Sequence, residues 1–186
     1  QNNGYDVFST WRSWDMPIPY LQEATKAIRA VSKQHDSTGI SMRQARVDEI
    51  VEEMQYIYEC ALDVFSDNYG FSRVSREEFI QAFLHLGPLL DSRLFHFMTN
   101  VEDVPIAFVY GYRDSPENPT RIVFHTVGVS SKHRGEATVY HLAVPFWEAA
   151  VEIGLPAVGG LAKEGRTTFD KCGPANRSYS VLAKKL

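Results

Sequence analysis

The chain has 186 residues, 44% of them hydrophobic and 12% aromatic, so it can bury a substantial core as one domain or as one domain with an extension. Its formal net charge of −4 argues against binding to nucleic acid or to an acidic membrane surface. No apolar run approaches the ~18 residues that a membrane span requires. The two cysteines, Cys60 and Cys172, form neither a C-x-x-C pair nor a zinc pattern, so we expect a reduced, cytoplasmic protein without a metal.

The first half of the chain is predicted to be mostly helical. Apolar spacing predicts a strand over residues 5–12 and a helix over 20–34. It then predicts a second strand over 40–46 and two further helices over 48–65 and 75–86. Asp48 is the expected N-cap of the second helix. Ser75 and Glu78 have the spacing of a capping box at the start of the third, which Gly87-Pro88 ends.

The second half is predicted to be a sheet crossed by one helix. Three strands at 93–99, 105–112 and 121–129 are joined by polar connectors, which favours consecutive antiparallel pairing. A helix over 136–152, containing Pro145, is followed by a strand at 157–162 that should lie parallel to 121–129, and by a last strand at 178–185. The fold class is therefore α/β, with a mixed, mainly antiparallel sheet flanked by helices.

The most informative segment joins the strand ending at Val129 to the helix that follows. The loop between them carries Lys132, His133 and Arg134 just before the helix begins. A helix start offers unpaired N–H groups and the positive end of the helix dipole, which together can hold a phosphate. The alternative interpretation is a solvated basic loop.

The order of elements from Gly39 to the end, together with Val127-Gly-Val-Ser-Ser-Lys-His-Arg-Gly135, resembles the GNAT superfamily of acyl-CoA N-acyltransferases. The resemblance covers residues 39–186 and implies acetyl-CoA as co-substrate. Residues 1–38 form an N-terminal arm and linking helix, similar to the end of a preceding lobe in tandem GNAT proteins. Because the chain begins at Gln1 rather than methionine, we expect a piece of a longer protein, with a second lobe or a homodimer as partner.

The resemblance implies roles for particular residues. Backbone groups of a splayed strand would align the pantetheine arm, and the matching residues here are Val127, Gly128 and Val129. The loop and the first amides of the helix would hold the pyrophosphate, and the matching residues are Lys132, Arg134, Gly135, Glu136, Ala137 and Thr138. The family often has a glutamate on this strand that acts as the general base. The matching residue here is His125, whose reference pKa suits a general base at neutral pH. The alternative for His125 is a purely structural histidine.

The remaining roles are less directly implied. In the family a tyrosine often acts as the general acid that protonates the leaving thiolate. The matching residue here is Phe169, which cannot give a proton, so Tyr179 is the candidate general acid, with Tyr140 as a substitute. Tyr69 and Phe71 lie where the family builds the pocket for the acceptor, although such aromatic residues can also simply cover the core.

The loop departs from the family pattern at two positions. Ala137 and Val139 stand where the motif has glycine and then glycine or alanine, residues that let the backbone approach a pyrophosphate closely. The leading hypothesis is an N-acyltransferase that moves an acetyl group from acetyl-CoA to an amine of a small molecule or peptide by direct attack. The alternative is a non-catalytic lobe that serves as a scaffold, a dimerisation module or an acyl-CoA sensor.

Overall fold

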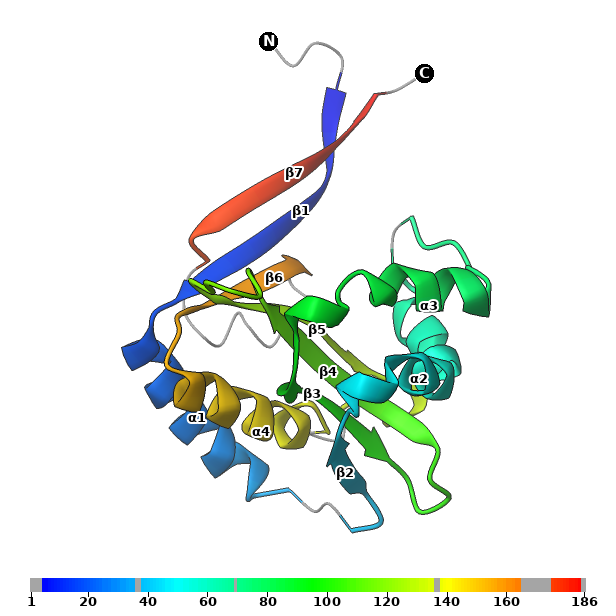
Figure 1. The fold of residues 1–186 in the computed structure, drawn as a ribbon. Coiled ribbons are helices and arrows are strands. Elements are labelled where there is room, and N and C mark those ends of the chain that lie inside the picture. The colour runs from blue at the N-terminus through cyan, green and yellow to red at the C-terminus, as the bar shows by residue number, and fades with distance from the viewer. Residues whose placement is uncertain (1–4, 36–37, 69, 136–137, 165–174, 185–186) are drawn as a thin grey trace.

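The part of the chain that the structure describes forms one seven-stranded sheet with two helices on each face (Figure 1). The computed structural model describes residues 5–35, 38–68, 70–135, 138–164 and 175–184. The strands are β1 Tyr5–Met16, β2 Ser41–Gln44, β3 Leu90–Thr99, β4 Pro105–Arg113, β5 Ile122–Val129, β6 Ala157–Lys163 and β7 Arg177–Lys184. The helices are α1 Ile18–Ser32, α2 Ile50–Phe65, α3 Arg76–Leu84 and α4 Thr138–Ile153. No helix within these ranges is both long and apolar enough to cross a membrane.

The strand order is β2-β3-β4-β5-β6-β1-β7. The predicted antiparallel meander is present as β3, β4 and β5, and β6 lies parallel to β5 after the α4 crossover, as expected. The remaining pairs in this sheet are antiparallel. The predicted fold class, a mixed and mainly antiparallel sheet flanked by helices, is confirmed.

Two apolar cores fill the space between the sheet and its helices. One lies under α1 and α4, where the rings of Phe124 and Trp147 stack with centroids 5.2 Å apart. The other lies under α2 and α3, where Phe95, Phe97 and Tyr110 form a group of ring contacts. The centre of the sheet is therefore covered on both faces, and this packing holds its central strands in place.

One helix cap was predicted correctly and the other was wrong. At α3, the Ser75 hydroxyl accepts from the Glu78 amide at 3.2 Å, and the Glu78 carboxylate accepts from the Ser75 amide at 2.8 Å. Asp48 instead lies inside a 3-10 turn, Val47–Glu49, and α2 begins after it without a capping side chain. The acidic pattern that suggested a cap belongs to this preceding turn.

The predicted N-terminal arm is part of the same sheet. Strand β1 pairs on one side with β6 and on the other with β7, and the buried Trp14 joins the core. Helix α1 packs on α4, where the Ser32 hydroxyl lies 2.7 Å from His141 Nδ1. That residues 1–38 are the end of a preceding lobe stays a prediction.

Candidate functional site

Strand β5 has a bulge where it leaves β6. Tyr110 pairs with Thr126 while Gly111 pairs with Phe124, so His125 is an extra residue opposite β4. The parallel pairing with β6 also ends here, at Phe124 and Gly159. A bulge bends its strand and re-aims side chains, so the opening between β5 and β6 begins at His125.

Gly160 is at the apex of this opening. A Cβ at this position would lie 2.9 Å from the carbonyl oxygens of both Phe124 and His125. The two backbones approach this closely only because Gly160 has no side chain. Past this point β6 keeps only its pairing with β1 on its other edge, with Ala162 opposite Arg12 and Lys163 opposite Trp11.

The hydrogen-bonding pattern of β5 leaves backbone groups facing the opening. The Ser130 amide donates to the Ile106 carbonyl at 2.8 Å. Because bonding and non-bonding positions alternate along an antiparallel pair, Gly128 bonds to β4 while the N–H and C=O groups of Val127 and Val129 face away from it. The Val129 carbonyl accepts from Arg134 Nε at 3.3 Å.

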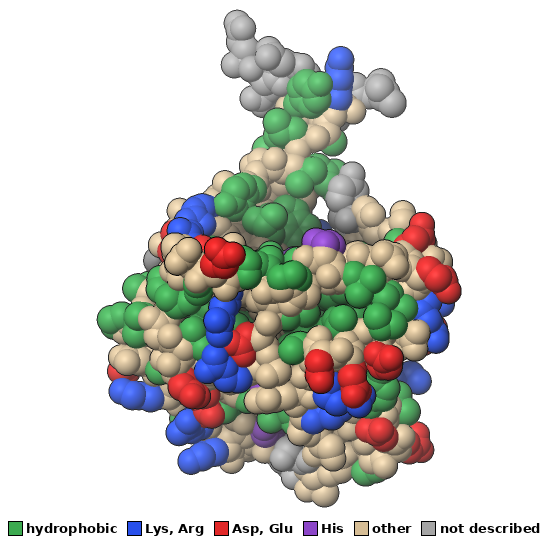
Figure 2. Space-filling view, in the orientation of Figure 1, with side chains coloured by type: hydrophobic (Ala, Val, Ile, Leu, Met, Phe, Trp, Pro, Cys, Tyr) green, Lys and Arg blue, Asp and Glu red, His purple; other side chains and the backbone are tan. Residues whose placement is uncertain are grey.

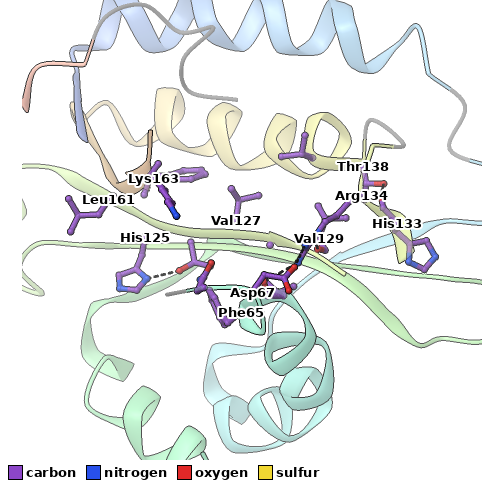
Figure 3. A pocket seen from close by; sticks show the side chains of 18 of the residues that line it. Phe65, Asp67, His125, Val127, Val129, His133, Arg134, Thr138, Leu161 and Lys163 are labelled. Atoms are coloured by element: carbon purple, nitrogen blue, oxygen red, sulfur yellow. Dashed lines mark hydrogen bonds and ion pairs between the residues drawn. The ribbon is translucent and has the colours of Figure 1, made fainter. Parts of the chain in front are cut away.

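A cleft of about 760 Å³ follows this opening (Figure 3). Its walls come from the end of α2, strand β5, the loop after it, the first turn of α4, strand β6 and Trp11 of β1. His133, Arg134 and Thr138 lie at one end, and His125, Leu161 and Lys163 lie toward the other (Figure 3). The structure thus brings the basic loop and the candidate base into one continuous cavity.

The basic loop is held on the end of α2 by two carboxylates. Asp63 accepts from the Ser131 amide at 2.6 Å and from its hydroxyl at 2.9 Å. The backbone bond, against some desolvation, lowers the pKa of Asp63. Asp67 accepts from Arg134 Nη1 at 2.9 Å, and the Val64 carbonyl accepts from Nη2 at 3.2 Å. The Arg134 guanidinium therefore both lines the cleft and holds the loop to α2.

His125 lies against an aromatic surface on the α2 and α3 side of the sheet. Its ring stacks on Tyr110 at 4.8 Å between centroids and lies 5.7 Å from Tyr112. Nδ1 is 2.8 Å from the Thr126 hydroxyl. Loss of water around the ring lowers the pKa of His125 below its usual 6.5. Burial raises the pKa of Tyr110, so its phenol stays protonated.

The other predicted site residues are more scattered. Lys132 is exposed and Phe71 is half-buried, and neither lines the cleft, whereas Thr138 and Gly135 do. Tyr179 lies on β7 outside the cleft lining, with its hydroxyl 3.4 Å from that of Ser13. Tyr69, Glu136 and Ala137 lie outside the described residues.

Sequence reasoning missed several cleft residues, among them Trp11, Leu161 and Lys163. They come together only because β1 pairs with β6. No local motif around them indicates that pairing, although the alternation of β6 could have marked Leu161 and Lys163 as sharing one face.

Comparison with known proteins agrees with this geometry at the level of the fold. A GCN5-related N-acetyltransferase from Sphaerobacter thermophilus superposes with a TM-score of 0.63 over 97% of this chain and 53% of its own, at 13% identity. The chain has the GNAT fold. The chain spans about half the length of the Sphaerobacter protein. No sequence-family profile and no curated protein sequence matches the chain.

Two further solved structures with the GNAT fold cover nearly the whole chain. A tandem GNAT protein from the clavulanic acid biosynthesis pathway has a TM-score of 0.56 over 95% of this chain and 53% of its own, at 11% identity. The GCN5-related glucosamine N-acetyltransferase region of a fungal multidomain GH3 β-N-acetylglucosaminidase has a TM-score of 0.60 over 96% of this chain and 21% of its own, also at 11% identity. The predicted GNAT resemblance is therefore confirmed as a fold.

Proposed function

We propose that the protein transfers an acetyl group from acetyl-CoA to the amine of a small molecule or peptide. The single observation that carries this proposal is the opening between β5 and β6, because it leaves backbone groups of Val127 and Val129 facing a cleft that also contains His125. Such groups can hydrogen-bond the amides of a pantetheine arm as a further strand would. The loop at the far end of the same cleft is suited to the pyrophosphate.

The reaction follows from this placement. The amine nitrogen attacks the thioester carbonyl carbon, the C–S bond breaks, and coenzyme A leaves as its thiolate. The proton released by the amine goes to His125 Nε2, which keeps its lone pair when Nδ1–H donates to the Thr126 hydroxyl. Because the pKa of His125 is lowered, the ring is neutral and able to accept that proton at neutral pH.

Acetyl-CoA should bind the purified protein in an isothermal titration, with free coenzyme A as a second ligand. Arg134→Ala should weaken binding by about tenfold or more, because a charge-assisted hydrogen bond is worth ~1.5–3 kcal/mol. Asp67→Asn separates two roles of Arg134. Tighter binding by that variant means that the freed guanidinium contacts phosphate directly, and weaker binding means that Arg134 acts by holding the loop on α2.

Arg121→Ala is the matched control, since this arginine is on the surface outside the cleft lining and should not alter the affinity. Absence of binding by folded wild-type protein would exclude the proposed function. Tight binding without coenzyme A release across a broad amine panel would instead support an acyl-CoA sensor.

His125→Phe should reduce kcat by ~10²–10⁴-fold, since the phenyl ring can keep the aromatic stacking but cannot accept a proton. In the wild type, kcat/KM should fall on the acid side as His125 becomes protonated, at a pH below 6.5 because its pKa is lowered. The variant should lose this inflection. His85→Gln, at an exposed position after α3, is the control. A variant with wild-type rate and pH profile would show that His125 is structural.

A further inference from the structure

One row of side chains crosses three strands beside the reacting end of the cleft. Lys163 of β6 is directly opposite Trp11 of β1, and Trp11 is directly opposite Tyr179 of β7. Residues directly opposite each other in a sheet share a face, and so do residues two apart in one strand. Leu161 therefore joins this row, which we call the β6–β7 row: Leu161, Lys163, Trp11 and Tyr179.

Within the described ranges, the β6–β7 row brings to the cleft a positive charge, that of Lys163, which no ion pair offsets. Among the charged side chains that line it, Asp67 and Arg134 pair with each other, and His133 bonds to the Ser130 hydroxyl. Lys163 has neither an ion pair nor a hydrogen bond to any residue in the described ranges, and Figure 3 shows its side chain pointing toward β5, between His125 and Val127.

Two carboxylates on or beside these strands, both within the described residues, are engaged with arginines. Glu164, next to Lys163 in the sequence, pairs with Arg12. Asp15 of β1 accepts from Arg177 at 2.7 Å. With respect to the described residues, the Lys163 ammonium is therefore available to attract an anion in the cleft, where desolvation strengthens such a contact.

The rest of the β6–β7 row is apolar and accessible. Leu161 is 60% exposed and Tyr179 is 44% exposed, whereas Ala162 between the two β6 residues packs into the core on the opposite face. Figure 2 shows hydrophobic side chains gathered where the β1–β7 ribbon leaves the body of the protein. A ligand with an apolar body could cover these side chains while its charged end meets Lys163.

We propose that the acceptor is an amine carrying both a carboxylate and an apolar body, such as a hydrophobic amino acid. Lys163 binds the carboxylate, Trp11 and Leu161 contact the apolar side chain, and the amine is directed toward His125. This inference rests on the proposed function. The same carboxylate chemistry could also come from the donor, as the free end of a dicarboxylic acyl group, and the test separates the two sources.

Acetyl transfer to L-phenylalanine, L-phenylalaninamide and L-alanine isolates each contact. Wild-type kcat/KM should be higher for phenylalanine than for its amide by about tenfold or more. The amide lacks the carboxylate, so it loses one charge-assisted hydrogen bond to Lys163. Lys163→Gln should abolish this preference, and Lys163→Arg should retain it. Leu161→Ser should reduce the preference for phenylalanine over alanine. Lys184→Gln, on the exposed end of β7, is the control and should leave both preferences unchanged.

Product binding provides a second readout that does not depend on turnover. In a titration, N-acetyl-L-phenylalanine should bind wild type at least about tenfold more tightly than N-acetyl-L-phenylalaninamide, and Lys163→Gln should remove the difference. Equal binding of both by wild type would overturn the inference, even if acetyl-CoA binds and the proposed function stands. Tighter binding of succinyl-CoA than acetyl-CoA, lost in Lys163→Gln, would overturn the acceptor assignment and place the carboxylate on the donor.

Discussion

Gly160→Ala should lower the melting temperature by roughly 4–12 °C and weaken acetyl-CoA binding. The added methyl group would lie 2.9 Å from the backbone carbonyl oxygens of Phe124 and His125, and backbone atoms cannot rotate away as a side chain can. Overpacking of this kind costs ~2–3 kcal/mol, and each kcal/mol lowers the melting temperature of a domain this size by ~2–4 °C. Thermal unfolding and an acetyl-CoA titration measure the two effects.

Gly87→Ala is the matched control. Gly87 does not have a positive φ, and nothing lies within 4 Å of the Cβ that alanine would add. The control should therefore have the stability and affinity of the wild type. If Gly160→Ala behaves like its control, β5 and β6 can separate at the apex without cost, and the position of the opening is not fixed by Gly160.

Glu53→Gln should destabilise the protein by ~2–3 kcal/mol, because the change breaks a buried ion pair. The Glu53 side chain is fully buried on α2 and accepts from Arg43 Nη1 at 2.9 Å and from Arg46 Nε at 2.7 Å. These bonds join α2 to β2 and to the turn before the helix. The two arginines are partly exposed and can regain water, so we expect less than the ~3–5 kcal/mol typical of a fully buried pair.

Urea denaturation gives this free energy directly. Glu52→Gln, one residue earlier and exposed, removes the same charge without breaking the buried pair, so its midpoint should stay near that of the wild type. An unchanged midpoint for Glu53→Gln would show that the contacts of Arg43 with the rings of Tyr56 and Phe97 are enough to fix β2 on α2.

The meander, the crossover and the α3 cap could be predicted because each is encoded locally. Ser75 and Glu78 are three residues apart, and the polar connectors of β3, β4 and β5 favour consecutive pairing. The place of β1 could not be predicted in this way. Alternation along residues 5–12 identifies a strand, but it does not identify the neighbours of that strand. Its insertion between β6 and β7 depends on edges formed more than 140 residues later.

The candidate site shows the same division. The strand, loop and helix around His125 and Arg134 are continuous in sequence, so the family's spacing indicated Val127 and Val129, whereas the Gly128 backbone bonds to β4 and does not face the cleft. The contacts of Arg134 with Asp67 and of Ser131 with Asp63 connect segments 67 and 68 residues apart. In the structure both carboxylates hold the loop on the end of α2.

The position of β1 also has a consequence for how the chain folds. Among the described strands β1 comes first in the sequence, yet it is an inner strand of the sheet, and its neighbours β6 and β7 come last in the sequence. Until they are made, β1 lacks these two neighbours, and contacts between segments so far apart in the sequence form slowly because closing a long loop costs entropy. We therefore expect β1 to join the sheet late in folding, with the nascent chain exposing an unpaired aromatic strand until β6 and β7 have been made.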